Sequence, residues 1–347
     1  MKNRVAVFRE TGVVTIEETE VKDPEKGELL IKILACNLCT SEYGIYSGNR
    51  TAKFPYRFGH EWTGTVIKVG EGVTGYKEGD FVGGCFEYDM ESVEAQTGYS
   101  ANAPRLYAFH EMNSDGYYGR FRGCAEYLIQ KAGCAFHLNS DLDPAEAAFL
   151  EPVATVISGI QKLHLSPSDK VLVIGAGTMG ILNALVAKAH GCKVVESEML
   201  EKKLKTAKMC GIETVDVSGK DAVEVIQEKY GKDGFDVVIV AVGLTDANRQ
   251  AAKLLKRNNG TILLFAAGYP APEVGIDANE IHYRNMCLQG TYTANYQDFY
   301  EAANYLSDRK IDVSALVEER FSFDDIDQAF KKAATPGSYR VSVLFDT

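Results

Sequence analysis

One stretch near the middle of the chain constrains the fold more than any other. Four aliphatic residues, 171–174, lead directly into a Gly-x-Gly-x-x-Gly sequence, and residues 181–189 are typical of a helix. A strand, this glycine turn and a helix in that order predict a dinucleotide site, because glycines let the backbone approach a pyrophosphate at the helix N-terminus. The loop residues expected to bind the cofactor are Gly175, Gly177, Thr178, Met179 and Gly180.

Strand and helix patterns alternate after about residue 155. The predicted strands are 171–174, 193–196, 237–241, 261–265 and 286–290, and the predicted helices between them include 200–209, 222–229 and 245–255. This alternation predicts right-handed βαβ units and a doubly wound parallel sheet. The backbone at the strand ends of such a sheet can contact the cofactor, and Gly243, Gly268 and Thr291 occupy such positions.

The choice between NAD and NADP depends on the residues after the second strand. An acidic residue about 20 positions beyond the glycines binds the ribose of NAD, whereas NADP needs a cation for its 2′-phosphate. Glu196 and Glu198 both lie at the end of this strand, and no arginine occurs within 197–201. Either glutamate could instead be an ordinary solvated residue at a strand end. We expect Glu198 to bind the ribose and NAD to be the cofactor.

Composition excludes several classes of protein. A length of 347 residues allows two domains, and a net charge of −11 argues against nucleic-acid binding. The chain shows neither a signal-peptide pattern nor an apolar run of bilayer length, so we expect no membrane association. Eight irregularly spaced cysteines fit free thiols in a reducing cytoplasm better than a disulfide framework.

The first 150 residues combine short strand patterns with residues that can bind a metal. The predicted strands are 4–8, 13–17, 29–35 and 63–69, and residues 297–309, 323–334 and 339–345 predict two helices and a last strand. Cysteine, histidine and carboxylate side chains together can bind zinc, and the candidates are Cys39, His60, Glu61 and Glu151. Each also has an ordinary explanation as a buried thiol, a turn histidine or a surface carboxylate. Their spacing alone does not establish that they converge.

The order of these motifs resembles that of the zinc-dependent medium-chain dehydrogenases. The shared features are Cys39-Thr-Ser41-Glu42, Gly59-His60-Glu61, Glu151-Pro152, the central glycine loop, Val69–Val73, Gly79–Val82, Gly123–Tyr127 and Asp236–Gly243. The similarity extends through essentially the whole chain. Within this family the chain is most similar to the polyol branch, such as sorbitol and galactitol-phosphate dehydrogenases.

The resemblance implies a role for each matching residue. Cys39 and His60 would bind zinc, and Glu61 and Glu151 would complete or exchange within its ligand set. Ser41 would hydrogen-bond the substrate oxygen and relay its proton. Glu42 replaces the usual aspartate that orients the zinc-bound histidine. Cys36 matches a position that is not a ligand and is expected to pack in the core.

The resemblance also implies the domain organisation. We expect an α/β chain in which residues 1–154 and 291–347 form a β-rich, GroES-like catalytic domain, and residues 155–290 form the inserted Rossmann domain. Many relatives carry four closely spaced cysteines for a structural zinc, but residues 83–123 contain only Cys85 and are rich in tyrosine. We therefore expect one catalytic zinc and no structural zinc. This segment could be a surface lobe, a subunit contact or an ordinary loop.

The implied activity is NAD-dependent oxidation of a secondary alcohol, a polyol, a sugar alcohol or its phosphate. Candidates for the pocket wall are Tyr43, Tyr46, Arg57, Phe58 and Tyr292, and Arg57 or Lys53 could bind a substrate phosphate. The family suggests a homodimer or homotetramer formed through the strand at 286–292. Two alternatives remain: a zinc-free NADPH-dependent enone or quinone reductase of the same fold, and a non-catalytic nucleotide-binding protein.

Overall fold

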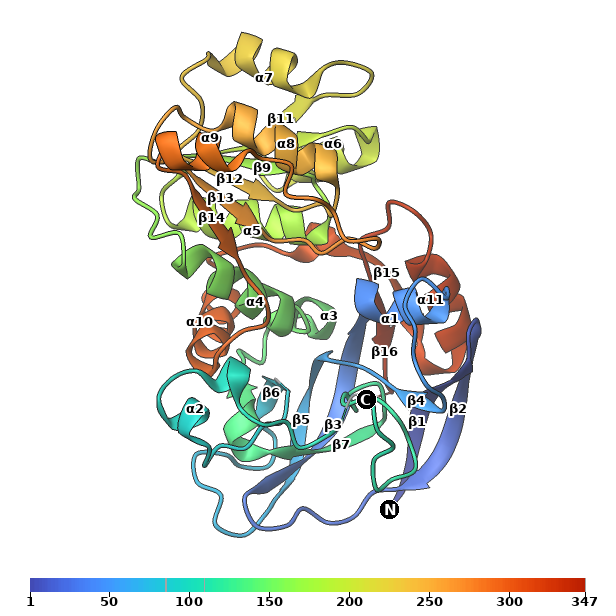
Figure 1. Ribbon diagram of the computed structural model, residues 1–347. Coiled ribbons are helices and arrows are strands. Elements are labelled where there is room, and N and C mark those ends of the chain that lie inside the picture. Colours follow the sequence, from blue (N-terminus) through green and yellow to red (C-terminus); the bar gives the residue numbers. More distant parts are fainter. Residues whose placement is uncertain (85, 109, 347) are drawn as a thin grey trace. The chain divides into compact units, whose positions relative to one another are not determined.

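The computed structural model describes residues 1–84, 86–108 and 110–346, which divide into two compact units (Figure 1). One unit contains residues 1–154, 294–310 and 316–347, and the other contains residues 155–293 and 311–315. The chain therefore builds most of the first unit, then the second, and afterwards returns to the first. Cys85 lies outside the described residues.

The second unit contains a parallel sheet of six strands in the order β11-β10-β9-β12-β13-β14. This is the strand order of a dinucleotide-binding fold, so the predicted doubly wound sheet is confirmed. The strands are β9 (Lys170–Ile174), β10 (Lys193–Glu198), β11 (Glu213–Asp216), β12 (Val237–Val240), β13 (Thr261–Leu264) and β14 (Cys287–Gly290). The helices are α5 (Thr178–Ala189), α6 (Glu201–Met209), α7 (Ala222–Tyr230), α8 (Thr245–Leu254) and α9 (Ala278–Tyr283).

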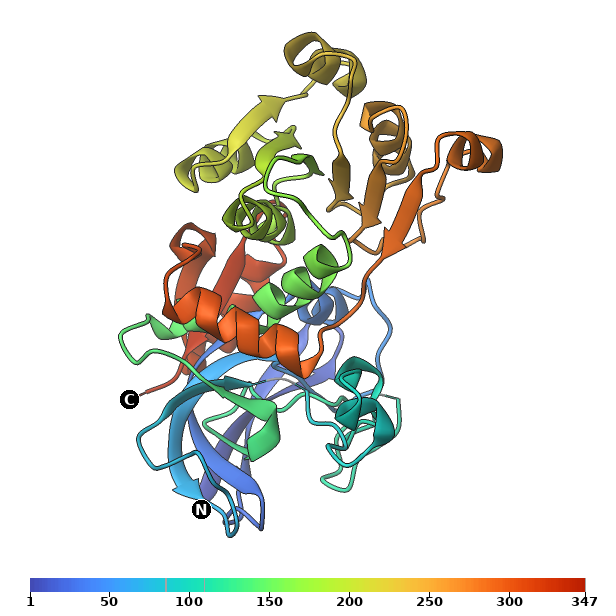
Figure 2. The same ribbon diagram turned by 90° about the vertical axis from the view of Figure 1, so that its left-hand side faces the viewer.

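Burial explains why these strands are continuous aliphatic runs. Val171, Leu172 and Val173 in β9 are fully buried, as expected for a parallel strand whose two faces are both covered. Helix α5 packs against β9 and β10, and α8 packs against β12 and β13. Figure 2 shows the strands of this unit lying between helices.

The structure corrects some predicted elements. Helix α5 begins at Thr178, three residues before the predicted start, because Gly177 is its N-cap. Strand β11 and helix α9 were not predicted. Strand β11 has only four residues and just one of them is buried, so its pattern carries little hydrophobic signal.

The first unit contains two sheets. The seven-stranded sheet has the order β15-β16-β3-β5-β6-β8, with β7 paired to β3, and the three-stranded sheet has the order β2-β1-β4. The strands are β1 (Lys2–Glu10), β2 (Val13–Glu20), β3 (Glu28–Leu38), β4 (Tyr56–Arg57), β5 (Glu61–Val69), β6 (Phe81–Gly84), β7 (Tyr127–Lys131), β8 (Ala135–His137), β15 (Val317–Ser322) and β16 (Arg340–Leu344). The α-helices are α1 (Thr40–Tyr46), α2 (Val93–Gln96), α3 (Pro144–Ala147), α10 (Tyr296–Ser307) and α11 (Ile326–Ala333), and α4 (Leu150–Gln161) includes the boundary between the units.

An aromatic cluster forms part of the core of this unit. The ring centroids of Phe8 and Phe58 lie 4.3 Å apart, and Phe330 packs edge-on against both rings. Tyr46 stacks on Phe330 at 5.2 Å. Phe58 and Tyr46 were expected to line a substrate pocket, but they are buried core residues instead. An aromatic residue next to a functional motif can belong to the core, because core packing also uses large aromatic side chains.

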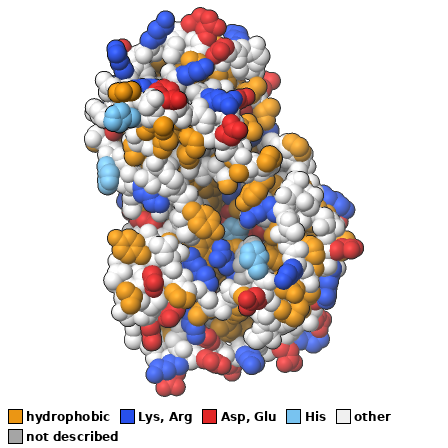
Figure 3. Space-filling view, in the orientation of Figure 1, with side chains coloured by type: hydrophobic (Ala, Val, Ile, Leu, Met, Phe, Trp, Pro, Cys, Tyr) orange, Lys and Arg blue, Asp and Glu red, His pale blue; other side chains and the backbone are white. Residues whose placement is uncertain are grey.

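Acidic and basic side chains are interspersed on the face shown in Figure 3. In the parts of the chain that the structure describes, no helix has the length and apolar character needed to cross a membrane.

Candidate functional site

The strand register of the first unit brings Cys39, Glu61 and Arg340 to the same level of the sheet. Strands β16, β3 and β5 are neighbours (Figure 1), with Val341 opposite Leu38 and Asn37 opposite Glu61. Arg340 therefore lies level with Cys39, and Glu61 lies on the other side of β3. Residues that are up to 301 positions apart in the chain meet at this point.

Arg340 forms the main contact with Glu61. Its Nε lies 2.8 Å from Oε2, and its Nη2 lies 2.8 Å from Oε1. The same Nη2 lies 3.6 Å from the Cys39 sulfur. Glu61 is completely buried and Arg340 is 4% exposed, so each charge depends on the other for compensation. Burial alone would lower the pKa of Arg340, but Glu61 and Cys39 outweigh it and raise that pKa.

His60 is oriented by Glu42 from the first turn of α1. Nδ1 of His60 lies 3.0 Å from Oε1 of Glu42, and the other Glu42 oxygen accepts a hydrogen bond from the Cys39 backbone at 3.0 Å. The Gly59 amide also donates to Glu42, at 2.8 Å. The longer glutamate side chain therefore does reach the imidazole. With Nδ1 engaged in this way, Nε2 is the nitrogen left for a metal, and it lies 3.9 Å from Glu61.

The contacts between Glu42 and His60 also shift the pKa values of both side chains. Burial opposes ionisation of Glu42, but His60 and the two backbone amides outweigh it and lower the pKa of Glu42. Burial likewise disfavours a charged His60, but Glu42 and Cys39 raise the pKa of His60 well above its ordinary value.

The ligand atoms of Cys39, His60 and Glu61 all lie within 4.8 Å of one another. Donor atoms around one tetrahedral zinc are separated by roughly 3–4 Å, so small adjustments would bring these three onto a metal. A thiolate, an imidazole and a carboxylate are suitable zinc donors, and the residues therefore fit this metal. Among residues 1–84, 86–108 and 110–346, this is the one group of three or more potential metal ligands.

Glu151, Ser41 and Cys36 are not members of this three-residue group. Glu151 is in the first turn of α4, half-buried, and is not part of the three-residue group. Ser41 is half-buried in the first turn of α1, two positions beyond Cys39. Cys36 is fully buried in the hydrophobic core. A hydrogen bond with Cys124, together with burial, raises the pKa of the Cys36 thiol, so it is a poor metal ligand.

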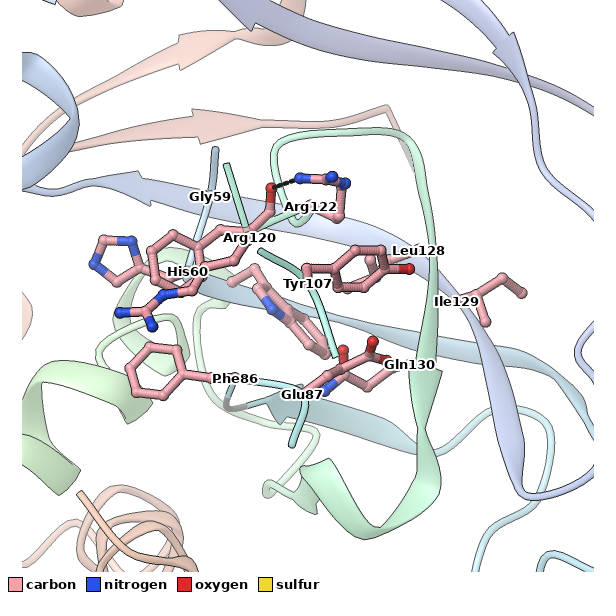
Figure 4. A pocket seen from close by; sticks show the side chains of 12 residues that line it. Gly59, His60, Phe86, Glu87, Tyr107, Arg120, Arg122, Leu128, Ile129 and Gln130 are labelled. Atoms are coloured by element: carbon pink, nitrogen blue, oxygen red, sulfur yellow. Dashed lines mark hydrogen bonds between the residues drawn. The ribbon is translucent and has the colours of Figure 1, made fainter. Parts of the chain in front are cut away.

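A pocket adjoins His60 on the side of the tyrosine-rich segment. It is lined by Gly59, His60, Trp62, Phe86, Glu87, Tyr107, Arg120, Phe121, Arg122, Leu128, Ile129 and Gln130. Figure 4 shows His60, Arg120 and Phe86 at one end and Glu87, Ile129 and Gln130 at the other. Phe86, Tyr107 and Phe121 of this segment therefore line the same pocket as His60, a candidate metal ligand.

The residues predicted to bind a substrate phosphate or to form the pocket wall lie outside the pocket beside His60. Arg57 lies 3.7 Å from Asp115 and donates to the Arg122 carbonyl. Burial lowers the pKa of Arg57 to about 10. Lys53 lies over the Tyr118 ring, the Tyr43 hydroxyl donates to Thr40, and Tyr292 is largely exposed. None of these residues lines the pocket beside His60.

The glycine loop of the second unit has two kinds of glycine. A Cβ on Gly180 would lie 1.8 Å from the Gly175 carbonyl oxygen, so the loop can close against α5 only with glycine there. A Cβ on Gly177 would meet only the Lys203 amine, at 3.9 Å. Gly180 thus serves packing, whereas Gly177 leaves the backbone open to an approaching ligand. Thr178 and Met179 form the first turn of α5.

Glu198 and Glu196 point toward the same face of β10 because they are two residues apart, but they lie at different depths. Glu198 accepts hydrogen bonds from the loop amide of Ala176 at 2.9 Å and from Leu200 at 3.0 Å. Glu196 is completely buried, and its Oε1 lies 3.0 Å from the Cβ position of Gly180. Only Glu198 is therefore placed at the open edge of the loop. The amine of Lys203 lies beside Gly177. This cation was not predicted as part of the cofactor site, although it follows β10 closely in the sequence.

The carboxyl group of Glu196 has no hydrogen-bond partner for either oxygen in the described structure, and neither has the hydroxyl of its cross-strand neighbour Thr214. Burial and the nearby Glu198 raise the pKa of Glu196 well above 4.5. Burial thus favours the neutral form of Glu196 beneath the nucleotide loop.

The remaining predicted cofactor contacts occupy the ends of β12, β13 and β14. Gly243 and Gly268 pack backbone against backbone, since a Cβ on Gly268 would lie 2.3 Å from the Gly243 carbonyl oxygen. Thr291 follows β14, and its hydroxyl accepts a hydrogen bond from Lys162 at 3.2 Å. The turns after β12 and β13 are therefore in backbone contact at the carboxyl edge of the sheet, where ligands bind in this fold.

Two family models match the chain in separate segments. Residues 25–140 match the alcohol dehydrogenase GroES-like domain, and residues 178–308 match the zinc-binding dehydrogenase model. Together they account for most of the chain, and their order agrees with the two units described above. The chain belongs to the zinc-dependent medium-chain dehydrogenase family and is an oxidoreductase.

Full-length relatives support this assignment. The chain is 28% identical to a sorbitol dehydrogenase of Halalkalibacterium halodurans over 95% of each protein. It is 29% identical to an L-threonine 3-dehydrogenase of Alteromonas mediterranea over 98% of each. A solved zinc-binding dehydrogenase from Sinorhizobium meliloti, bound to NADP, has a TM-score of 0.87 at 24% identity and covers 99% of each chain. Its likeness bears on the fold alone.

Gly177 and Gly180 provide a matched pair of substitutions. Gly177→Val should leave the melting temperature nearly unchanged and abolish NADH binding, because the new side chain enters open space where a pyrophosphate would lie. Gly180→Val should destabilise the protein strongly, because its side chain would collide with the Gly175 backbone. Calorimetry and NADH fluorescence titration measure the two effects. Undiminished NADH affinity in Gly177→Val would contradict the assignment of the loop.

Glu196→Gln tests the neutral buried acid. Because the native pKa of Glu196 is raised, its favourable neutral form is complete below about pH 4.5 and is lost as pH rises through the native pKa. Wild type and Glu196→Gln should therefore be similarly stable at pH 5. At pH 8 the variant should be more stable by about 1–3 kcal/mol in denaturant unfolding. An equal difference at both pH values would show that Glu196 does not titrate as proposed.

Proposed function

We propose that this protein is a zinc- and NAD-dependent dehydrogenase of secondary alcohols, most suitably a polyol, a sugar alcohol or its phosphate. The observation that carries the proposal is the convergence of Cys39, His60 and Glu61 within 4.8 Å, with Glu42 held against the other histidine nitrogen. When bound, zinc lowers the pKa of a hydroxyl that it contacts, and NAD accepts a hydride.

The roles of the protein residues follow from their positions. Cys39 and His60 bind the metal throughout, and either Glu61 or Glu151 completes the set of protein ligands. Glu42 holds the Nδ1 proton of His60 and thereby presents Nε2 to the metal. Arg340 competes with a metal for Glu61, so Glu61 can bind zinc only by giving up some of its guanidinium contacts. Ser41 is the proposed hydrogen-bond partner and proton relay of the substrate hydroxyl.

The proposed cofactor is NAD rather than NADP. A carboxylate at the loop edge accepts hydrogen bonds from ribose hydroxyls and repels a 2′-phosphate. Glu198 supplies that carboxylate, although Lys203 brings a compensating positive charge to the same loop. Gly175, Gly177, Thr178, Met179, Gly180, Gly243, Gly268 and Thr291 complete the proposed nucleotide site.

Substrate class, assembly and location are also proposals. The two relatives favour a substrate with a hydroxyl group, since one is a sorbitol dehydrogenase and the other an L-threonine 3-dehydrogenase. The outer edge of β14, with Cys287 and Tyr292 exposed, is the proposed contact of a homodimer or homotetramer. The described cysteines are all unpaired, which suits the reducing cytoplasm.

Cys39→Ser should reduce bound zinc from about one per chain and lower NAD-dependent alcohol oxidation at least 100-fold, because it removes a metal ligand. NADH affinity should persist, since the nucleotide loop is untouched. Metal analysis and fluorescence titration provide these measurements. Cys36→Ala is the matched control and should keep its zinc. Full turnover by Cys39→Ser would favour the zinc-free alternative. The same conclusion would follow if the wild type contained no zinc and showed only NADPH-dependent reductase activity.

Glu198→Ala should reduce the ratio of the NADP to the NAD dissociation constant by about 10-fold or more, because the carboxylate no longer repels the 2′-phosphate. Glu196→Gln is the control, since Glu196 lies beneath the loop rather than at its edge. The ratio of the two dissociation constants, measured by titration, gives the answer. An unchanged ratio in Glu198→Ala would remove this residue from the proposed cofactor site.

A further inference from the structure

Helix α3 lies on the face of the seven-stranded sheet that carries candidate metal ligands. It contacts β3, β5 and β16, which are neighbours in the sheet. Asn37 lies opposite Glu61, and Thr63 lies two residues beyond Glu61, so these three side chains point to one face. Asn37 also precedes Cys39 by two residues. The strands that bring two candidate ligands together thus also present two polar side chains to α3.

Asn37 and Thr63 each donate a hydrogen bond to a backbone carbonyl of α3. The side-chain nitrogen of Asn37 lies 3.0 Å from the Ala145 oxygen, and the Thr63 hydroxyl lies 2.9 Å from the Pro144 oxygen. Asn37, Thr63 and Ala145 are all fully buried. Because solvent does not reach these groups, the two hydrogen bonds hold α3 against the sheet.

The end of α3 depends on the hydrogen bond from Asn37. In a continuous α-helix the Phe149 amide would donate to the Ala145 carbonyl, four residues earlier. It donates instead to the Glu146 carbonyl at 3.1 Å, and Asn37 takes its place at Ala145. In the described structure the Oδ1 atom of Asn37 and the hydroxyl of Ser342 opposite have no partner. The bond to Ala145 is therefore the single hydrogen bond that the described Asn37 side chain makes.

The position of α3 also fixes the start of α4, because just two residues separate the two helices (Figure 1). A Cβ on Gly83, the β6 residue opposite Thr63, would lie 2.8 Å from the Leu150 side chain. Helix α4 therefore begins on the same face of the sheet, and Glu151 follows in its first turn. Glu151 also has an interaction of its own, so the contacts of α3 fix where its helix begins rather than every torsion of its side chain.

We propose that Asn37 and Thr63 are positioning residues of the candidate metal site. By holding α3 against β3 and β5, they place Glu151 where it can exchange with Glu61 as a zinc ligand. This inference rests on the proposed function and adds to it two residues that are not themselves ligands. Both act through α3 and the first turn of α4.

Thr63→Val and Asn37→Leu remove the two hydrogen bonds and nearly conserve the side-chain shape. In the metal-free protein both variants should increase amide hydrogen exchange in residues 145–153, because α3 loses its contacts with the sheet. The zinc dissociation constant, measured by competition with a chelator, should rise about 10-fold. The visible absorption bands of the Co(II)-substituted protein should shift, since they respond to ligand geometry. Thr63→Ser keeps the hydroxyl and should restore all three measurements.

Asn3→Leu is the matched control, because Asn3 is a buried asparagine of the same unit that hydrogen-bonds the Tyr127 backbone instead of α3. It should lower the melting temperature but leave the zinc affinity and the cobalt spectrum unchanged. If Asn3→Leu lost as much zinc affinity as Asn37→Leu, the effect of Asn37 would be one of general stability and the positioning role would be wrong. Unchanged hydrogen exchange of residues 145–153 in Asn37→Leu and Thr63→Val would also overturn it.

A double-mutant cycle tests whether the effect passes through Glu151. Glu151→Gln should itself weaken zinc binding, and Thr63→Val should add almost nothing in that background, because residues that act through one another are not additive. Additive losses, or an unchanged zinc affinity in Glu151→Gln, would overturn the positioning role. A wild-type protein that binds neither zinc nor Co(II) would instead refute the proposed function, and the hydrogen-exchange comparison would still decide whether Asn37 and Thr63 hold the helix.

Discussion

The buried ion pair between Glu61 and Arg340 is the contact on which the first unit's functional region depends. It joins the beginning of β5 to the beginning of the last strand, β16, across β3, and it also brings a positive charge to the Cys39 sulfur. Removing one partner of such a pair leaves an uncompensated buried charge, which costs about 3–5 kcal/mol. Three potential metal ligands can therefore stand together in a folded protein because the C-terminal strand supplies the balancing charge. Arg340 therefore contacts the candidate metal ligands Glu61 and Cys39 and also contributes to the stability of the fold.

The nucleotide-binding edge of the second unit depends on close contacts between backbone segments rather than on a buried ion pair. Gly180 permits α5 to pack against the loop, and Gly243 and Gly268 allow two strand-end turns to touch. These contacts bring the ends of β9, β12 and β13 together, which concentrates backbone polar groups where a nucleotide can bind. Gly177 is the exception, since its surroundings leave space for a side chain. The difference between Gly177 and Gly180 separates a glycine needed for the fold from a glycine that suits a ligand.

The sequence predicted the parallel sheet well because each βαβ unit carries its own local signal. Strands β9 and β12 are aliphatic runs bounded by turns, whereas β11 has a single buried residue and gave no such signal. The candidate metal ligands came from a resemblance, since no local pattern connects Cys39 with His60 and Glu61. Arg340 was missed for the same reason, although a single arginine within an apolar final strand could have indicated a buried partner. Glu196 and Glu198 could not be separated by periodicity, because residues two apart share one face of a strand.

The segment from 84 to 122 illustrates how a departure from a family pattern can carry information. It lacks the four cysteines of a structural zinc site, and the described part instead supplies Phe86, Tyr107 and Arg120 to the pocket beside His60. A segment without metal crosslinks needs other contacts, and arginine–aromatic pairs around Phe86 provide some of them. Arg122 and Arg57 pair with Asp115 of this segment, and Arg120 and Arg122 both line the pocket. Side chains that stabilise the segment thus also place charged groups beside His60.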